Sequence, residues 1–129
     1  MTTAAARSVA EQRDTAVPDA SLLAARAADS KLGDQTVILS VGDALGITEA
    51  FVITSGGNAR QVRTIADEVE LQLKEAEEGR APIRIEGLDD ARWVLMDYGD
   101  FLVHVFVDEA REYYDLEHLW ADAPRVAWA

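Results

Sequence analysis

The stretch from Ser55 to Asn58 has a composition that could hold a phosphate group. It reads Ser-Gly-Gly-Asn and separates an apolar run from a segment with helical periodicity. Backbone N–H groups at the start of a helix attract anions, and glycine allows close approach of the ligand. Neither a Lys-Ser/Thr pair nor a full Gly-x-Gly-x-x-Gly pattern is present. The structural interpretation is that the glycines permit a sharp turn and Asn58 caps the next helix.

Four carboxylates could in principle bind a hard cation such as magnesium, which prefers oxygen ligands. These residues are Asp97, Asp100, Asp108 and Glu109. They do not form an Asp-x-Asp pair on one strand face. Asp97 and Asp100 instead flank a turn, where aspartate is common because its side chain bonds to the nearby backbone. The sequence therefore favours a turn at this position over a metal site.

The remaining candidates for catalysis are two histidines and one serine. His104 alternates with apolar residues, which favours a hydrogen-bonded structural role, and His118 has no partner at metal-ligand spacing. Ser55 lacks the Gly-x-Ser-x-Gly frame of an activated nucleophile. The chain contains no cysteine, which excludes disulfides and thiolate chemistry. We therefore predict no catalytic residue, no metal and no cofactor.

A β-hairpin is the clearest element that the sequence predicts. Aromatic and β-branched residues fill positions 93–96 and 101–107, and Asp-Tyr-Gly-Asp between them tolerates a tight turn. Side chains alternate between the two faces of a strand. One face of the hairpin should therefore carry Trp93, Leu95 and Asp97, and the other should carry Val94, Met96 and Tyr98.

Both faces of this hairpin are largely apolar, and two interpretations follow. Strands that are apolar on both sides are usually central in a sheet that is covered on both faces. The alternative is that one face lies open to a partner, because Trp93 and Tyr98 are residue types that interface centres favour. If alternation is strict, these two side chains share an interface only when Tyr98 leaves the strand register.

The rest of the chain predicts alternating helices and strands. Asp19 is expected to cap the first helix, and about eight residues separate the first two strands, which favours antiparallel pairing. The predicted elements are a helix over 19–33, a strand over 36–41, a turn over 42–46, a strand over 50–54, a helix over 59–78, an edge strand over 82–86 and helical turns over 108–120. This order predicts a single α/β domain with a mixed five-stranded sheet flanked by helices.

Composition limits the function classes. A chain of 129 residues with 49% apolar content can build one core, and it has no apolar run of the ~18 residues that a membrane span needs. Residues 1–18 predict a flexible tail without a signal peptide, and hence a cytoplasmic protein. The formal charge of −12 opposes nucleic-acid binding. Eleven acidic and three basic residues lie from Glu86 onward, where they serve either solubility or a basic protein partner.

Four sequence blocks in a fixed order closely resemble the ribosomal silencing factor family, also called Iojap. They are SGGNARQVRTIADEV at 55–69, EG at 86–87, RWVLMDYGDFLVHVF at 92–106 and REYYDLEHLW at 111–120. The resemblance indicates a silencing-factor domain over 19–122, followed by a C-terminal extension over 123–129. One departure is Thr48-Glu49-Ala50, where the family usually carries Thr-Asp-Tyr or Thr-Asp-Cys.

The resemblance implies a fold like that of nucleotidyltransferases without their Gly-Ser and Asp-x-Asp catalytic set. It also implies a translational repressor that is not an enzyme. Such a repressor binds ribosomal protein fourteen (uL-fourteen) of the large subunit and sterically blocks joining of the small subunit when nutrients are limiting. Free members of the family can pair as homodimers.

On this basis the hairpin is the expected partner-binding surface. The residues expected to take part are Trp93, Leu95, Met96, Asp97, Tyr98 and Asp100. Its apolar side chains would anchor the partner, and its carboxylates would face basic groups. The alternative function is a nucleotide-binding or nucleotidyl-transferring enzyme that uses residues 55–58 and the carboxylates near the hairpin.

Overall fold

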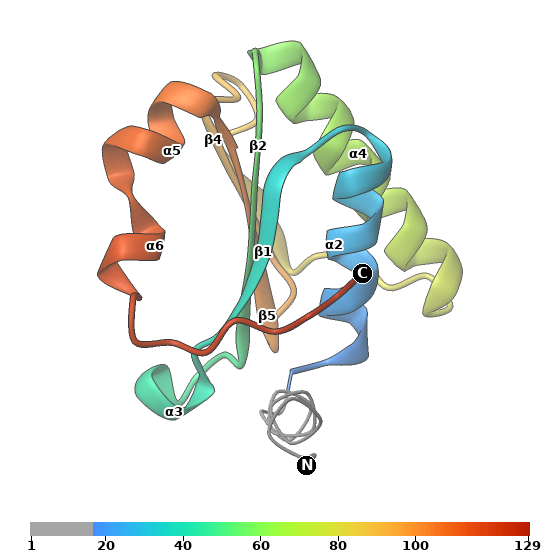
Figure 1. Ribbon diagram of the computed structural model, residues 1–129. Coiled ribbons are helices and arrows are strands. Elements are labelled where there is room, and N and C mark those ends of the chain that lie inside the picture. The colour runs from blue at the N-terminus through green and yellow to red at the C-terminus, as the bar shows by residue number, and fades with distance from the viewer. Residues whose placement is uncertain (1–16) are drawn as a thin grey trace.

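Five strands form a mixed sheet that helices cover on both faces (Figure 1). The computed structural model describes residues 17–129. The strands are β1 (Asp34–Ser40), β2 (Ala50–Gly56), β3 (Arg84–Glu86), β4 (Trp93–Asp97) and β5 (Phe101–Val107), in the order β1-β2-β5-β4-β3. β2 and β5 run parallel, and the other neighbouring strands pair antiparallel. The predicted fold class, the antiparallel first pair and the edge position of residues 84–86 are confirmed.

The helices divide between the two faces of the sheet. α2 (Asp19–Ser30) and α4 (Ala59–Ala76) cover one face, whereas α5 (Asp108–Tyr114) and α6 (Leu116–Leu119) lie over the other (Figure 1). α4 turns an apolar stripe to the sheet at three- and four-residue steps. The buried residues of this stripe are Val62, Ile65, Ala66, Val69 and Leu73.

The hairpin of β4 and β5 forms as predicted. Trp93 lies opposite Phe106, and Asp97 lies opposite Leu102. β5 is flanked by β2 on one side and β4 on the other, so it is central in the sheet. Val103 and Val105 of β5 are fully buried on the face that α4 covers. The prediction that the hairpin is a central element is therefore confirmed.

Two local predictions were wrong. Asp19 does not cap α2, because Pro18 occupies the N-cap position with extended backbone and Asp19 is the first helical residue. Proline suits the start of a helix because its fixed φ matches the helix entry. Residues 42–46 are also not a plain turn. Gly42–Leu45 form the short helix α3, which ends at Gly46 in the left-handed conformation, φ 75°.

The C-terminal segment lies along the outer edge of β1, although its sequence has no periodicity (Figure 1). The Ser40 N–H donates to the carbonyl of Pro124 at 2.8 Å, and the Val126 N–H donates to that of Ile38 at 2.9 Å. The indole of Trp128 donates to the carbonyl of Thr36 at 2.9 Å. The predicted extension over 123–129 thus covers a strand edge that would otherwise be free to pair. Residues 1–16 of the predicted tail lie outside the described residues.

Replacing Gly87 with alanine is expected to lower the free energy of unfolding by about 2–4 kcal/mol. Gly87 has φ +91°, and a Cβ at this position would overlap the carbonyl oxygen of Trp93. Urea unfolding measures the loss. Gly79→Ala is the matched control, because Gly79 has φ +88° but a Cβ there would meet no atom within 4 Å. It should lose only the left-handed penalty of about 1–2 kcal/mol, and equal losses at both sites would contradict the clash.

Candidate functional site

Trp93, Leu95 and Asp97 share the face of the sheet that lies toward α5, and all three are half-buried. The indole of Trp93 stacks on the ring of Phe106 with the centroids 4.9 Å apart. It also packs against Tyr114 of α5 at 4.7 Å. Trp93, Leu95, Asp97 and Tyr114 together are called the Trp93 patch. This patch is a partly exposed aromatic and aliphatic surface beside a carboxylate, which suits protein recognition.

Met96 and Tyr98 lie on the opposite face, which corrects their expected exposure. Met96 is fully buried, and Tyr98 is only 4% exposed. The Tyr98 ring stacks on Phe101 at 4.9 Å under the guanidinium of Arg80. Burial raises the pKa of Tyr98 to about 12, so its phenol stays neutral. The alternation of the strand continues through residue 98, and therefore Trp93 and Tyr98 do not share a surface.

The carboxylates of the hairpin turn have arginine partners. Asp97 accepts a hydrogen bond from the Gly99 N–H at 2.9 Å and lies 3.5 Å from a guanidinium nitrogen of Arg84. Asp100 is half-exposed and pairs with Arg80, which also donates to the carbonyl of Tyr98. The turn interpretation is therefore confirmed. Within residues 17–129 there is no cluster of three His, Cys, Asp or Glu side chains that could hold a metal.

The Ser-Gly-Gly-Asn turn has its polar groups occupied by the protein. The side-chain oxygen of Asn58 accepts from the Gln61 N–H at 2.9 Å, and that of Gln61 accepts from the Gly57 N–H at 2.8 Å. Ser55 is buried, and its hydroxyl accepts from Arg111 at 3.1 Å. Asn58 is thus the predicted helix cap. The N–H groups of Gly57 and Gln61 are already satisfied, so the turn is built as a helix start.

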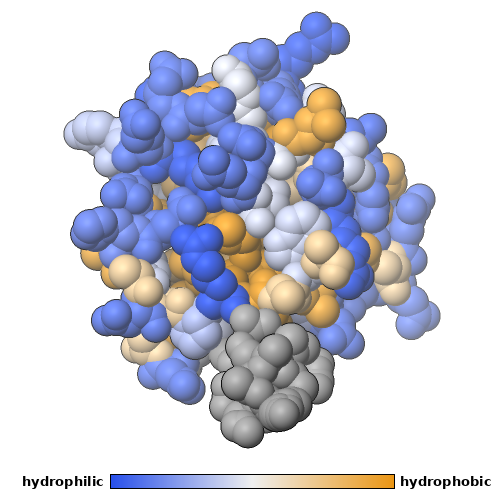
Figure 2. All heavy atoms as spheres, in the orientation of Figure 1, coloured by the Kyte–Doolittle hydropathy of each residue, from blue (hydrophilic) through white to orange (hydrophobic). Residues whose placement is uncertain are grey.

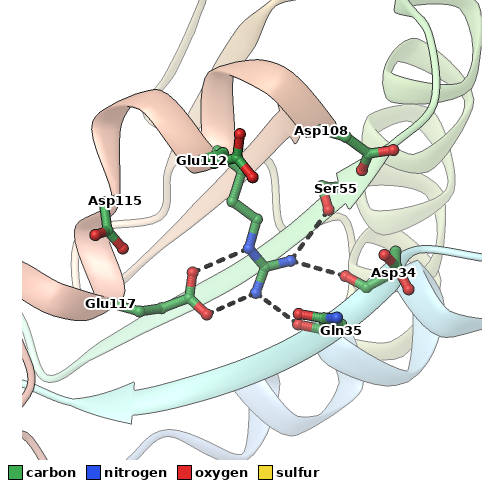
Figure 3. A pocket seen from close by; sticks show the side chains of 8 residues that line it. Asp34, Gln35, Ser55, Asp108, Glu112, Asp115 and Glu117 are labelled. Carbon is green, nitrogen blue, oxygen red and sulfur yellow. Dashed lines mark hydrogen bonds and ion pairs between the residues drawn. The ribbon is translucent and has the colours of Figure 1, made fainter.

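Arg111 is the most extensively bonded side chain in this region, and sequence reasoning missed it (Figure 3). It donates to the carbonyls of Asp34 and Gln35 at 2.8 and 2.7 Å, to Ser55 at 3.1 Å, and to both oxygens of Glu117 at 3.0 and 2.9 Å. These five residues form what is called the Arg111 clasp. The hydrogen bond from Arg111 lowers the pKa of the Glu117 carboxyl. The clasp ties α5 to β1, β2 and α6.

The pocket beside the Arg111 clasp is shallow and acidic. Its volume is about 300 Å³. Besides the clasp it is lined by Asp108, Glu112 and Asp115 (Figure 3). All the donors of the guanidinium are used within the protein, so Arg111 has none left for an anion. The arrangement supports a structural role for this pocket.

His104 accepts a hydrogen bond from Trp93, which confirms its predicted structural role. The Trp93 Nε1–H donates to His104 Nδ1 at 3.1 Å, and His104 is 5% exposed. Burial lowers the pKa of His104 to about 4. The imidazole is therefore neutral near pH 7.

The pKa of His104 predicts a stability that declines in acid. In the window between pH about 4 and pH 6.5 the unfolded chain binds more protons than the folded protein, so stability rises with pH. The contribution of neutral His104 to the free energy of unfolding is complete above pH 6.5 and is lost as pH falls through about 4. Its full size is on the order of 3 kcal/mol. Urea unfolding should show this loss in the wild-type protein and not in His104→Asn, and parallel pH profiles would contradict it.

Tyr113 and Tyr114 extend the aromatic surface beyond the hairpin. Their rings meet edge to face at 5.0 Å, and Tyr113 is 80% exposed. The adjacent pair in REYY could have identified this surface, since exposed neighbouring tyrosines are typical of interfaces. The outer surface over α5 and α6 is otherwise largely hydrophilic (Figure 2). It includes the exposed residues Asp108, Glu109, Glu112, Asp115 and Asp122.

Comparisons with known proteins agree with this architecture. The sequence model of the family "Ribosomal silencing factor during starvation" matches residues 14–129. The ribosomal silencing factor RsfS of Halalkalibacterium halodurans is 44% identical over 104 residues, covering 81% of this chain and 87% of that protein. The same factor of Bacillus subtilis is 41% identical over 102 residues, covering 79% and 85%.

A solved structure shows the same fold. The crystal structure of a Chromobacterium violaceum protein superposes with a TM-score of 0.77 at 32% identity, covering 88% of this chain and 92% of that one. No helix within residues 17–129 is both long and apolar enough to cross a membrane. The extent of the family match and the identity to these relatives lead to one assignment. The chain belongs to the ribosomal silencing factor family.

Proposed function

We propose that this protein is a ribosome-associated regulator that acts by binding and not by catalysis. Its target is ribosomal protein fourteen of the large subunit, and its effect is to keep the small subunit from joining. The observation that carries the proposal is the Trp93 patch, a partly exposed surface that Trp93, Leu95 and Asp97 of β4 form with Tyr114 of α5. Family membership supports the association with ribosomes.

Steric exclusion requires only a stable contact at the right place. Two bodies cannot occupy the same volume, so a domain bound at the subunit-joining face blocks the second subunit without a chemical step. A standard interface of roughly 800 Å² per partner is sufficient for such a complex. The Trp93 patch with Tyr113 and the adjoining edge strand β3 offers a starting point for an interface of this kind.

The electrostatics favour a basic protein over RNA as the direct contact. Asp97 lies within the Trp93 patch, and the exposed acidic residues of α5 lie near Tyr114 along the same helix. Phosphate groups repel these carboxylates, whereas lysine and arginine side chains attract them. The acidic surface would then guide the domain to a basic partner within the RNA-rich subunit.

Electrostatic steering by the acidic surface predicts that the association rate constant falls as salt is added. Raising ionic strength from about 0.05 to 0.5 M shortens the screening length severalfold and should slow association about tenfold or more, with a smaller change in dissociation. Stopped-flow fluorescence with purified large subunits measures both rate constants. An association rate constant that is independent of salt would contradict electrostatic steering.

The enzymatic alternative receives no support from the site. The hydroxyl of Ser55 and the N–H of Gly57 are bonded within the protein. Asp97 and Asp100 lie at one end of β5, whereas Asp108 and Glu109 follow its other end. The groups that a nucleotidyl-transfer site would bring together are therefore apart. A thermal-shift measurement with nucleoside triphosphates and magnesium tests the alternative directly, and strong stabilisation would favour it.

The proposed function is tested by co-sedimentation with purified large ribosomal subunits. The wild-type protein should sediment with large subunits, and addition of small subunits should then yield fewer joined ribosomes than in its absence. Excess free ribosomal protein fourteen should compete for the protein and restore joining. Failure to co-sediment, or unchanged joining at saturating protein, would reject the proposal.

We further propose that the free protein is cytoplasmic and can pair as a homodimer through its exposed apolar surface. Large exposed apolar patches favour self-association. If the dimer covers the Trp93 patch, ribosomal protein fourteen should dissociate it. Sedimentation equilibrium with and without that partner measures the change in oligomeric state.

A further inference from the structure

His104 is a buried histidine whose imidazole bonds to Trp93. The Trp93 Nε1–H donates to His104 Nδ1 at 3.1 Å. A nitrogen that accepts a hydrogen bond carries no proton, so the neutral imidazole holds its proton on Nε2. Nε2 is buried and has no hydrogen-bond partner within residues 17–129. The imidazole thus accepts the hydrogen bond of the indole N–H, but its own Nε2–H has no acceptor.

Stability by itself does not account for a histidine at this position. A buried N–H without a partner costs free energy, and an apolar side chain would fill the same space without that cost. The surroundings are aromatic: Phe51 lies 4.8 Å from the imidazole and Phe106 lies 6.2 Å from it, between ring centroids. What histidine adds in this setting is an acceptor for the indole N–H of Trp93.

We propose that His104 is a positioning residue that fixes the indole of Trp93 in the orientation in which the Trp93 patch binds its partner. This inference rests on the proposed function. The hydrogen bond holds the indole N–H toward the protein interior, so the indole presents hydrocarbon to the outside. Phe106 and Tyr114 pack against the same ring and restrict its tilt. An anchor that is already ordered in the free protein loses less conformational entropy on binding.

Charged groups do not disturb this hydrogen bond. Within the described residues, Asp97 and Arg84 on neighbouring strands pair with each other, and Arg111 on α5 pairs with Glu117. None of these side chains forms a hydrogen bond or ion pair with the imidazole. Burial alone keeps the pKa of His104 at about 4. The acceptor at Nδ1 is therefore available across the neutral pH range and is lost on protonation in acid.

Two variants separate positioning from packing. His104→Leu fills the space without an acceptor, whereas His104→Asn places a carbonyl oxygen near the position of Nδ1. The ¹H–¹⁵N spectrum of the full chain reports the indole N–H, and Trp93→Phe assigns it among the three tryptophans. Co-sedimentation with purified large subunits reports binding in the same variants.

The expected result is that His104→Leu shifts the Trp93 indole resonance and weakens subunit binding about tenfold, while its circular dichroism stays native. His104→Asn should restore most of the resonance position and of the affinity. In the wild-type protein the resonance should titrate as pH falls through about 4, and in His104→Asn it should not. A folded His104→Leu protein that binds like the wild type would overturn the inference.

The two proposals fail in different ways. If the wild-type protein does not bind large subunits, the proposed function is rejected and the binding role of His104 is rejected with it. If the protein binds but the Trp93 resonance is the same in His104→Leu and insensitive to acid, the positioning role alone is rejected.

Discussion

Replacing Trp93 with alanine is expected to weaken binding to the large subunit by about 30-fold to 1,000-fold, which corresponds to about 2–4 kcal/mol. Trp93 is half-buried on the face of the hairpin that lies toward α5, and it packs against Phe106 and Tyr114. Large aromatic anchors at the centre of an interface carry much of its binding free energy. Co-sedimentation at varied subunit concentration measures the change in affinity.

Trp128→Ala is the matched control for this experiment. Trp128 is also half-buried and also donates its indole N–H to an internal acceptor, the carbonyl of Thr36. It lies along β1, at the opposite edge of the sheet from β3. Both variants should lose a similar amount of stability, and only Trp93→Ala should lose binding. Equal binding by the two variants would remove Trp93 from the interface.

Tyr98→Asp should behave differently from Trp93→Ala, because Tyr98 belongs to the core. Its ring stacks on Phe101 under the guanidinium of Arg80, and it is only 4% exposed. A carboxylate there would be buried beside Arg80, whose guanidinium already pairs with Glu77 and Asp100, and its desolvation is strongly destabilising. Any loss of binding by this variant should therefore accompany loss of native circular dichroism.

Replacing Arg111 with methionine is expected to lower the free energy of unfolding by about 3–5 kcal/mol. The variant leaves the carboxylate of Glu117 and the carbonyls of Asp34 and Gln35 without their donors. Buried polar groups that lose their partners carry the full cost of their desolvation. Urea unfolding followed by circular dichroism measures the loss.

Two further variants test the geometry of the Arg111 clasp. Arg111→Lys keeps the charge but lacks the planar fork that reaches four partners, so it should recover only part of the stability. Arg84→Met is the control for removal of an arginine, since the side chain of Arg84 is 62% exposed and its shorter ion pair is with the exposed Glu86. That change should cost less than about 1 kcal/mol. Full recovery by Arg111→Lys would show that charge alone sustains the clasp.

The sequence predicted those features that depend on local periodicity. Alternation over 93–107 predicted the hairpin, and three- and four-residue spacing over 59–78 predicted α4 and its buried stripe. Asn58 and the glycines before it predicted the helix start, because capping involves neighbours in the chain. The four sequence blocks also indicated the family to which the chain belongs.

The tertiary structure decided how distant segments meet. The Arg111 clasp joins residues 76 and 77 positions apart, and Trp128 bonds to a residue 92 positions away. Such contacts do not recur at the period of 2 of a strand or of 3.6 of a helix, so the periodicity of the sequence does not predict them. Whether each aromatic side chain is buried also depends on which helices cover its face of the sheet. For that reason the sequence alone could propose both Trp93 and Tyr98 for binding. In the structure, Tyr98 is buried on the face that α4 covers, whereas Trp93 stays partly exposed beside α5 on the other face.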